Sequence, residues 1–284
     1  SVSAAFAYSK SSFNQAEANP TPTITGTTGG SFNASSGLVF VDTGTFNSST
    51  GQIDLSASTI DSHIITYTVD GVQSGQTVGI ESAPYSSTRS FSFDGVNDYF
   101  DAGTGLGDSL GTYTGDLTLS YWFNTDSLTA NRGLFYIGSF SNSQGELQVN
   151  IFANSMRFRV EGGTKTKLLD ITSLSTGIWY HIGFVYKAGD ISGSKVYLNG
   201  AEQTTTDTGT FPSSLPFSGL KTIIGGYYGT GNTFDGKLDE VSVWNTALSS
   251  DAVTEIYNSG APNSLTSLTH ASSSALVAWY KMGE

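Results

Sequence analysis

The chain has 284 residues, enough for one large or two medium domains with a sizeable core. It carries 12 Lys and Arg against 24 Asp and Glu, a net charge of −12, and no Cys. The acidic balance argues against a nucleic-acid partner, and the lack of Cys excludes disulfides, thiolate metal sites and Cys nucleophiles. No apolar run is long enough to span a bilayer, so we expect no membrane insertion.

Residues 1–83 predict a small first β domain. Apolar or alternating runs at 38–41, 53–55 and 65–69 are separated by turn residues, including Asp70-Gly71. This spacing predicts a small immunoglobulin-like sandwich. Residues 19–26, 49–59 and 65–69 also resemble tandem repeats of large surface adhesins of Bacteroidetes. Many of those repeats carry a Cys near the position of Asn14-Gln15, which this chain lacks.

A polar linker at 81–88 precedes a second set of predicted strands. In the run 117–123, residues 117, 119, 121 and 123 are expected to face the core, and Trp122 the other side. Runs at 147–151 and 156–160 predict a hairpin about Ala153-Asn154. The run 196–198 ends in Asn199-Gly200, a strong hairpin signal.

Residues 234–248 predict a turn and a strand that lead into a helix. The turn is expected at Asp235-Gly236, and the strand has apolar residues at 238, 241 and 243. Ser249 is a plausible N-cap for the helix, and Gly260 is expected to close it.

Several motifs in order carry a family resemblance. Residues 91–99 read Phe-Ser-Phe-Asp-Gly-Val-Asn-Asp-Tyr, and residues 234–241 read Phe-Asp-Gly-Lys-Leu-Asp-Glu-Val. Between them lie the runs 117–123, 177–181, 196–200 and 223–225. Together they resemble laminin-G-like, concanavalin-A-like jelly-roll domains over residues 86–261. The resemblance implies an all-β chain: an immunoglobulin-like sandwich followed by a jelly roll with one short helix.

The expected domains are therefore 1–83, an immunoglobulin-like sandwich, and 84–261, the jelly roll. Residues 262–284 are expected to be a linker and a terminal strand. Residues 276–284 resemble the strand that, in this family, opens a further repeat, so we expect a piece of a longer protein, with a strand that folds back on the jelly roll as the alternative. We expect an exported cell-surface protein, with a virion surface as the alternative.

Carbohydrate binding generally uses aromatic rings beside polar side chains on a loop or concave face. Tyr227, Tyr228 and Asn232 form such a loop between glycine turns, and Trp122 is a further candidate. For any single aromatic residue, packing in the core is the competing interpretation.

Calcium is the metal that the oxygen-rich motifs favour. Asp94, Asn97 and Asp98 lie in the opening motif and Asp239 in the closing motif, and many relatives bring these motifs together. Calcium takes six to eight oxygen ligands. The alternative is that these side chains cap turns by accepting hydrogen bonds from backbone amides.

The sequence favours a non-catalytic extracellular adhesion or recognition module that binds a surface glycan or protein, within a chain of neighbouring repeats. The first alternative is a structural building block of a virion fibre, capsid decoration or surface filament. A glycoside hydrolase is the second alternative. It is disfavoured because Glu146 to Asn150 lacks the second carboxylate of the glucanase pattern that the jelly-roll superfamily uses.

Overall fold

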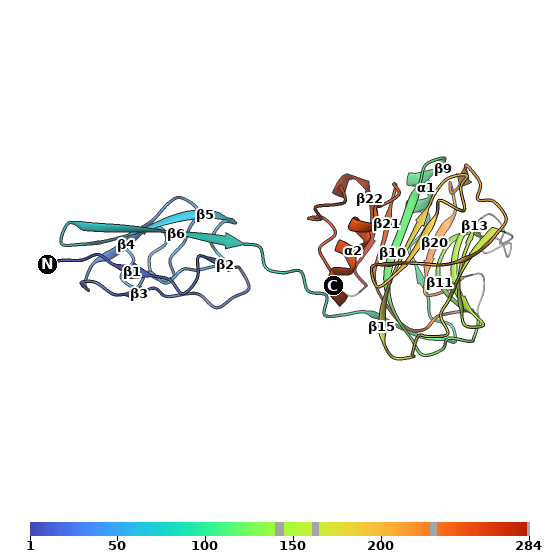
Figure 1. Cartoon of the computed structure of the whole chain (residues 1–284), viewed down its shortest axis with the longest axis horizontal. Coiled ribbons are helices and arrows are strands. Elements are labelled where there is room, and N and C mark those ends of the chain that lie inside the picture. The colour runs from blue at the N-terminus through green and yellow to red at the C-terminus, as the bar shows by residue number, and fades with distance from the viewer. Residues whose placement is uncertain (140–144, 161–164, 228–231, 283–284) are drawn as a thin grey trace. The chain divides into compact units, whose positions relative to one another are not determined.

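A computed structural model describes residues 1–139, 145–160, 165–227 and 232–282. The chain divides into two compact units, Ser1–Tyr85 and Ser86–Glu284. The boundary lies two residues beyond the one that the sequence predicts. Figure 1 shows the strands of both units. Each unit has its own core.

The first unit is a small β structure. In its described residues, one sheet has the order β2-β6-β5-β4, with β2 parallel to β6, and a second sheet pairs β1 with β3. The bounds are β1 Phe6–Ala7, β2 Ser12–Asn14, β3 Thr23–Ile24, β4 Ser31–Ala34, β5 Asp61–Val69 and β6 Val72–Glu81. The predicted runs at 38–41 and 53–55 contribute buried side chains but form only isolated bridges, such as Phe40 with Ile53. The immunoglobulin-like assignment stays a prediction.

The second unit is a sandwich of two antiparallel sheets, as the predicted jelly roll requires. The first sheet has the order β17-β16-β15-β10-β21-β22, and β7 also pairs with β21. Its strands are β7 Phe91–Asp94, β10 Leu117–Thr125, β15 Trp179–Tyr186, β16 Lys195–Leu198, β17 Ala201–Gln203, β21 Asp235–Trp244 and β22 Leu276–Tyr280.

The second sheet has the order β18-β14-β13-β12-β11-β20-β8. Its strands are β8 Phe100–Asp101, β11 Arg132–Gly138, β12 Gly145–Phe152, β13 Ser155–Val160, β14 Lys165–Asp170, β18 Thr206–Thr208 and β20 Lys221–Ile224. A short separate ladder joins β9 (Thr112–Tyr113) to β19 (Leu215–Pro216).

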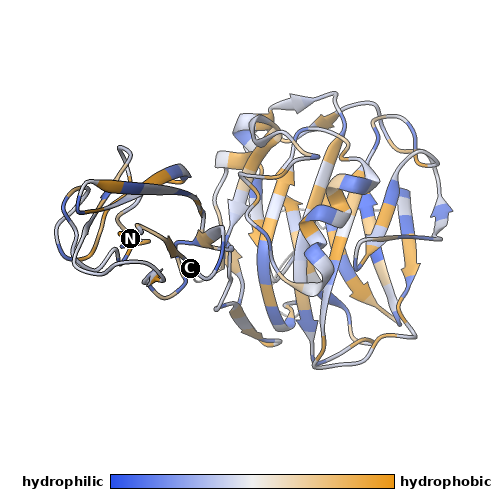
Figure 2. Cartoon of the chain, turned by 60° about the vertical axis from the view of Figure 1, so that its left-hand side comes forward, coloured by the Kyte–Doolittle hydropathy of each residue, from blue (hydrophilic) through white to orange (hydrophobic). Residues whose placement is uncertain are grey.

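The core lies between the two sheets, and strand alternation builds it. Figure 2 shows hydrophobic residues recurring along the strands of this unit. As predicted, β10 turns residues 117, 119, 121 and 123 into the core, where β12 and β13 contribute apolar residues from the other sheet. The hairpin at Ala153-Asn154 is confirmed, and both residues have positive φ. Asn199-Gly200 also forms the predicted turn, with φ of 50° and 77°.

Helix α2 (Ser250–Tyr257) covers the outer face of the first sheet (Figure 1). The predicted N-cap is confirmed, because the Ser249 hydroxyl accepts a hydrogen bond from the Ala252 amide. The predicted end differs: the left-handed residue that closes the helix is Asn258, not Gly260. Apolar α2 residues pack on this face, forming a second cluster with Val185, Tyr197 and Trp244. A six-residue helix, α1 (Gly105–Leu110), has no counterpart in the sequence prediction.

Strands β7 and β22 share one edge of β21. Strand β7 pairs with residues 235–238, and β22 pairs with residues 241–244. The segment 262–284, predicted as a separate linker and terminal strand, therefore includes a strand of the second unit. Asp239 and Glu240 lie between the two paired stretches. A pocket lined by Asp239 opens at this position.

Candidate functional site

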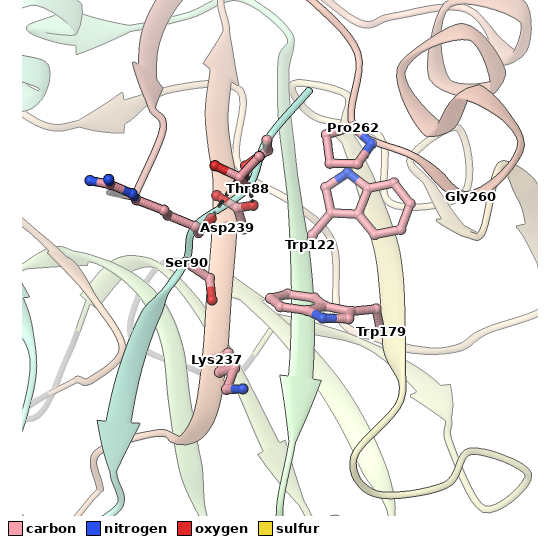
Figure 3. A pocket seen from close by; sticks show the side chains of 10 residues that line it. Thr88, Ser90, Trp122, Trp179, Lys237, Asp239, Gly260 and Pro262 are labelled. Carbon is pink, nitrogen blue, oxygen red and sulfur yellow. Dashed lines mark hydrogen bonds between the residues drawn. The ribbon is translucent and has the colours of Figure 1, made fainter. Parts of the chain in front are cut away.

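A pocket of about 320 Å³ opens on the outer face of the first sheet (Figure 3). Trp122 of β10, Trp179 of β15 and two residues of β21, Lys237 and Asp239, form its strand side. The segment 87–90, which leads into β7, and two residues that follow α2 complete it: Ser87, Thr88, Arg89, Ser90, Gly260 and Pro262.

A β-bulge in β21 aims Asp239 into this pocket. The register with β10 shifts between Ser120 and Trp122, so that β21 has one extra residue. That residue is Glu240, whose φ of 51° lies in the left-handed region that few non-glycine residues adopt. After the bulge, Asp239 is paired with Trp122 and shares its outward direction.

The Asp239 carboxylate is held in a fixed orientation. The side chain is 6% exposed. Its Oδ2 accepts a hydrogen bond from the Ser87 hydroxyl at 2.8 Å, and its Oδ1 accepts one from the Glu240 amide at 2.9 Å. The segment 87–90 is thus attached to β21 at the wall of the pocket.

The two indoles have different roles. Trp122 is 5% exposed and stacks on Tyr257 of α2, with ring centroids 5.7 Å apart. Trp179 is 38% exposed. Trp122 therefore forms a fixed wall, and Trp179 offers a ring surface to a ligand.

His181 supports Trp122 from within the sheet. It is fully buried, its ring lies 5.2 Å from that of Trp122, and its Nε2 lies 2.8 Å from the Ser120 hydroxyl. Burial lowers the pKa of His181 to about 3, so the imidazole is neutral near pH 7. This environment suits a structural residue and not a general base.

The predicted carbohydrate-binding residues lie in two separate places. Trp122 belongs to the pocket on the first sheet. Tyr227 and Asn232 flank the outer face of the second sheet, where Asn131 contacts both: its Nδ2 donates to the Tyr227 hydroxyl and, at 3.2 Å, to Asn232 Oδ1. Tyr228 lies outside the described residues.

Trp179 is a pocket residue that the sequence analysis did not select. It precedes His181 by two residues, and His181 pairs with Trp122 across β10 and β15. Strand alternation therefore places Trp179 on the same face as Trp122. The sequence shows that Trp179 and His181 share a face, but the pairing of His181 with Trp122 is known only from the structure.

The four predicted calcium ligands do not converge. Asp94 pairs with Asp235, four residues or roughly 13 Å along β21 from Asp239. Asp94 Oδ1 accepts hydrogen bonds from the amides of Val96 and Asn97 at 2.8 and 3.3 Å, and these bonds lower its pKa. Asn97 and Asp98 are exposed. Among the described residues there is no group of three or more His, Asp or Glu that could hold a metal ion. The geometry favours the turn-cap interpretation, and calcium binding stays a prediction.

These features agree with comparisons to known proteins. The family model of the concanavalin A-like lectin/glucanase superfamily matches residues 94–254, more than half of the chain. The chain therefore belongs to this superfamily, whose laminin-G-like branch the motifs predict. No curated protein matches the sequence.

Among solved structures, a proposed carbohydrate-binding protein from Bacteroides ovatus is 15% identical, with a TM-score of 0.54. The alignment covers 98% of this chain and 89% of that one, which shows a shared fold. A sialidase CBM40 module from Ruminococcus gnavus, bound to sialyllactose, is 16% identical over 60% of this chain and 97% of its own, with a TM-score of 0.45. None of the helices in the described residues is long and apolar enough to cross a membrane.

Proposed function

We propose that the chain is a non-catalytic carbohydrate-binding module and that the pocket between Trp122 and Trp179 holds the sugar. The observation that carries the proposal is the half-exposed Trp179 ring beside the oriented carboxylate of Asp239. The superfamily assignment and the shared fold with a proposed carbohydrate-binding protein support it.

The chemistry of the pocket suits a neutral pyranose. One face of such a ring presents C–H groups that pack on an indole, and its hydroxyls donate hydrogen bonds to a carboxylate. Lys237, exposed at the pocket, supplies a donor for sugar oxygens. A volume of about 320 Å³ lies at the lower end of small-molecule sites, which suits one or two sugar units of a longer chain.

The carboxylates at the site support binding and not hydrolysis. A retaining glycosidase needs two accessible carboxylates about 5–5.5 Å apart. Glu240 is 4% exposed and accepts a hydrogen bond from the Trp279 indole at 2.6 Å, so it is directed to β22. Asp239 is attached to Ser87. The proposed setting is an extracellular surface protein.

Binding to a panel of neutral polysaccharides by affinity electrophoresis, followed by calorimetry on each hit, tests the proposal. Trp179→Ala is expected to weaken binding at least tenfold, about 1.4 kcal/mol, because the ring is the exposed contact surface. Ile178→Ala is the matched control, since Ile178 is 52% exposed and does not line the pocket. Equal losses in both variants, or no bound polysaccharide, would contradict the proposal.

A further inference from the structure

A second group of polar side chains lies on the outer face of the second sheet. Strand β12 turns Leu147, Val149 and Ile151 into the core, so Gln148 and Asn150 face outward. Arg159 pairs with Gln148 and Arg157 with Asn150 across β12 and β13. We call this group the polar face: Asn131, Gln148, Asn150, Arg157, Arg159 and Tyr227.

Two buried amides of the polar face have polar atoms with no hydrogen-bond partner in the part of the chain that the structure describes. Asn150 is fully buried, and its Nδ2 donates to Asn131 Oδ1 at 2.8 Å, but its Oδ1 accepts nothing. Gln148 is 3% exposed, and its Oε1 accepts a hydrogen bond from Arg159 at 3.4 Å. Its Nε2 makes no hydrogen bond of regular geometry, although the side chain lies close enough to the Tyr227 hydroxyl to lower the pKa of that phenol. Such groups are rare in folded proteins, so an unpaired acceptor and donor side by side on one strand call for an explanation.

Two guanidinium groups lie together beside these amides. Burial and the neighbouring positive charge of Arg159 lower the pKa of Arg157. The Arg157 guanidinium stacks on the Phe152 ring, 3.8 Å from its centroid. The two arginines stand two residues apart on β13 and so share one face of the sheet.

A tyrosine hydroxyl completes the group. Burial raises the pKa of Tyr227, which keeps the phenol neutral and able to donate a hydrogen bond. Its hydroxyl contacts Asn131, which links it to Asn150. The polar face therefore combines two guanidinium groups with neutral donors and acceptors.

We propose that the polar face is a second binding site and that it takes an acidic sugar, with the sugar carboxylate on the arginines. A planar guanidinium forms paired hydrogen bonds with a carboxylate, and two such groups lie side by side on β13. The unpaired atoms of Gln148 and Asn150 bond to the hydroxyls of the same sugar. The site is separate from the indole pocket and does not depend on it.

Calorimetry of the intact chain with two carboxylated probes, trigalacturonate and a hyaluronan hexasaccharide, tests this inference. At least one probe is expected to bind, and Arg157→Gln and Arg159→Gln should each weaken it at least tenfold. The affinity of Arg157→Lys should lie between those of the wild type and Arg157→Gln, because lysine keeps the positive charge but lacks the planar guanidinium that forms two parallel hydrogen bonds. The methyl ester of the bound probe should bind at least tenfold more weakly than the carboxylate form. Added NaCl should weaken binding of the carboxylate form, because salt screens the attraction between charges.

Two controls locate the bound probe. Lys237→Gln removes a cation of the indole pocket, and Trp179→Ala removes its exposed ring. Neither is expected to change binding of the acidic probe. Unchanged melting temperatures of the arginine variants show that they fold. The proposal is overturned if neither probe binds, if the ester binds as well as the acid, or if the pocket variants and not the arginine variants lose binding.

Discussion

Trp122 and Asp239 are paired across β10 and β21, and their side chains line one pocket although 117 positions separate them in the sequence. The bulge at Glu240 makes this pairing possible, because it changes which residues of β21 face outward. Sugar binding is therefore expected to depend on the carboxylate and on the bulge, and each can be altered separately.

Asp239→Asn is expected to weaken sugar binding about tenfold, since hydrogen bonds to charged groups contribute about 1.5–3 kcal/mol against about 1 kcal/mol for neutral ones. The fold should persist, because an amide oxygen can still accept the Glu240 N–H bond. Calorimetry with the polysaccharide found for the wild type measures the loss. Asp61→Asn, on an exposed strand residue of the first unit, is the control. Unchanged affinity in Asp239→Asn would show that the carboxylate does not contact the sugar.

Glu240 allows a test of the bulge itself. Glu240→Ala and Glu240→Gly both remove the bond to the Trp279 indole, but only glycine adopts positive φ without penalty. We expect the alanine variant to be less stable than the glycine variant by about 1 kcal/mol. Urea unfolding followed by Trp fluorescence reports on the second unit, where all four Trp residues lie. Equal stability of the two variants would argue against the left-handed bulge.

His181 predicts a dependence of stability on pH. The unfolded chain binds a proton near pH 6.5, whereas the folded imidazole stays neutral down to about 3. Between these values the unfolded state holds more protons, so the free energy of unfolding falls as pH falls, by up to about 1.4 kcal/mol per pH unit. This contribution is fully present above pH 6.5.

The diagnostic window is pH 6.5 to 4.5, above the range in which most carboxylates titrate. His181→Asn should flatten the slope there, because it removes the buried imidazole. A wild-type slope that His181→Asn does not change would mean that His181 is not the group responsible.

The calcium prediction can be tested by melting the chain in chelator and in millimolar calcium. With Asp94 bonded to two amides and separated from Asp239, we expect both curves to coincide. Asp94→Asn is expected to lower the melting temperature slightly, because an amide oxygen accepts the bonds from Val96 and Asn97 more weakly than a carboxylate does. A rise in melting temperature with calcium, but not with a sodium salt of matched ionic strength, would instead support the metal interpretation.

Local patterns in the sequence predicted much of the sandwich. Alternation in 117–123 identified the core face of β10, and Asn199-Gly200 and Ser249 marked a turn and a helix start that the structure confirms. These features depend on near neighbours in the chain, which a sequence displays directly.

Asp235-Gly236 shows where that reasoning was wrong. The pair was predicted to be a turn, but it begins β21 and pairs with β7. A Cβ at Gly236 would lie 2.1 Å from the carbonyl oxygen of Asn124, so the glycine permits close approach of two strands. That requirement is set by a distant segment, and the dipeptide alone could not reveal it.

The site was only partly predictable for the same reason. Trp122 and Asp239 were both selected, but for different roles, because their pairing depends on a bulge. The signal for the bulge was the spacing of Leu238 and Val241, which lie three residues apart. Both side chains reach the core, whereas core-facing residues of a regular strand lie two residues apart. Tyr227 and Asn232 were selected together, and Asn131 does connect them, on the sheet opposite Trp122.

The most direct test of the central claim is a crystal structure of the chain with the neutral oligosaccharide that binds best. The account predicts a pyranose ring packed on Trp179 at about 3.5–4.0 Å, with a hydroxyl within hydrogen-bond distance of Asp239. A sugar bound at another surface, with no sugar density between Trp122 and Trp179, would contradict it.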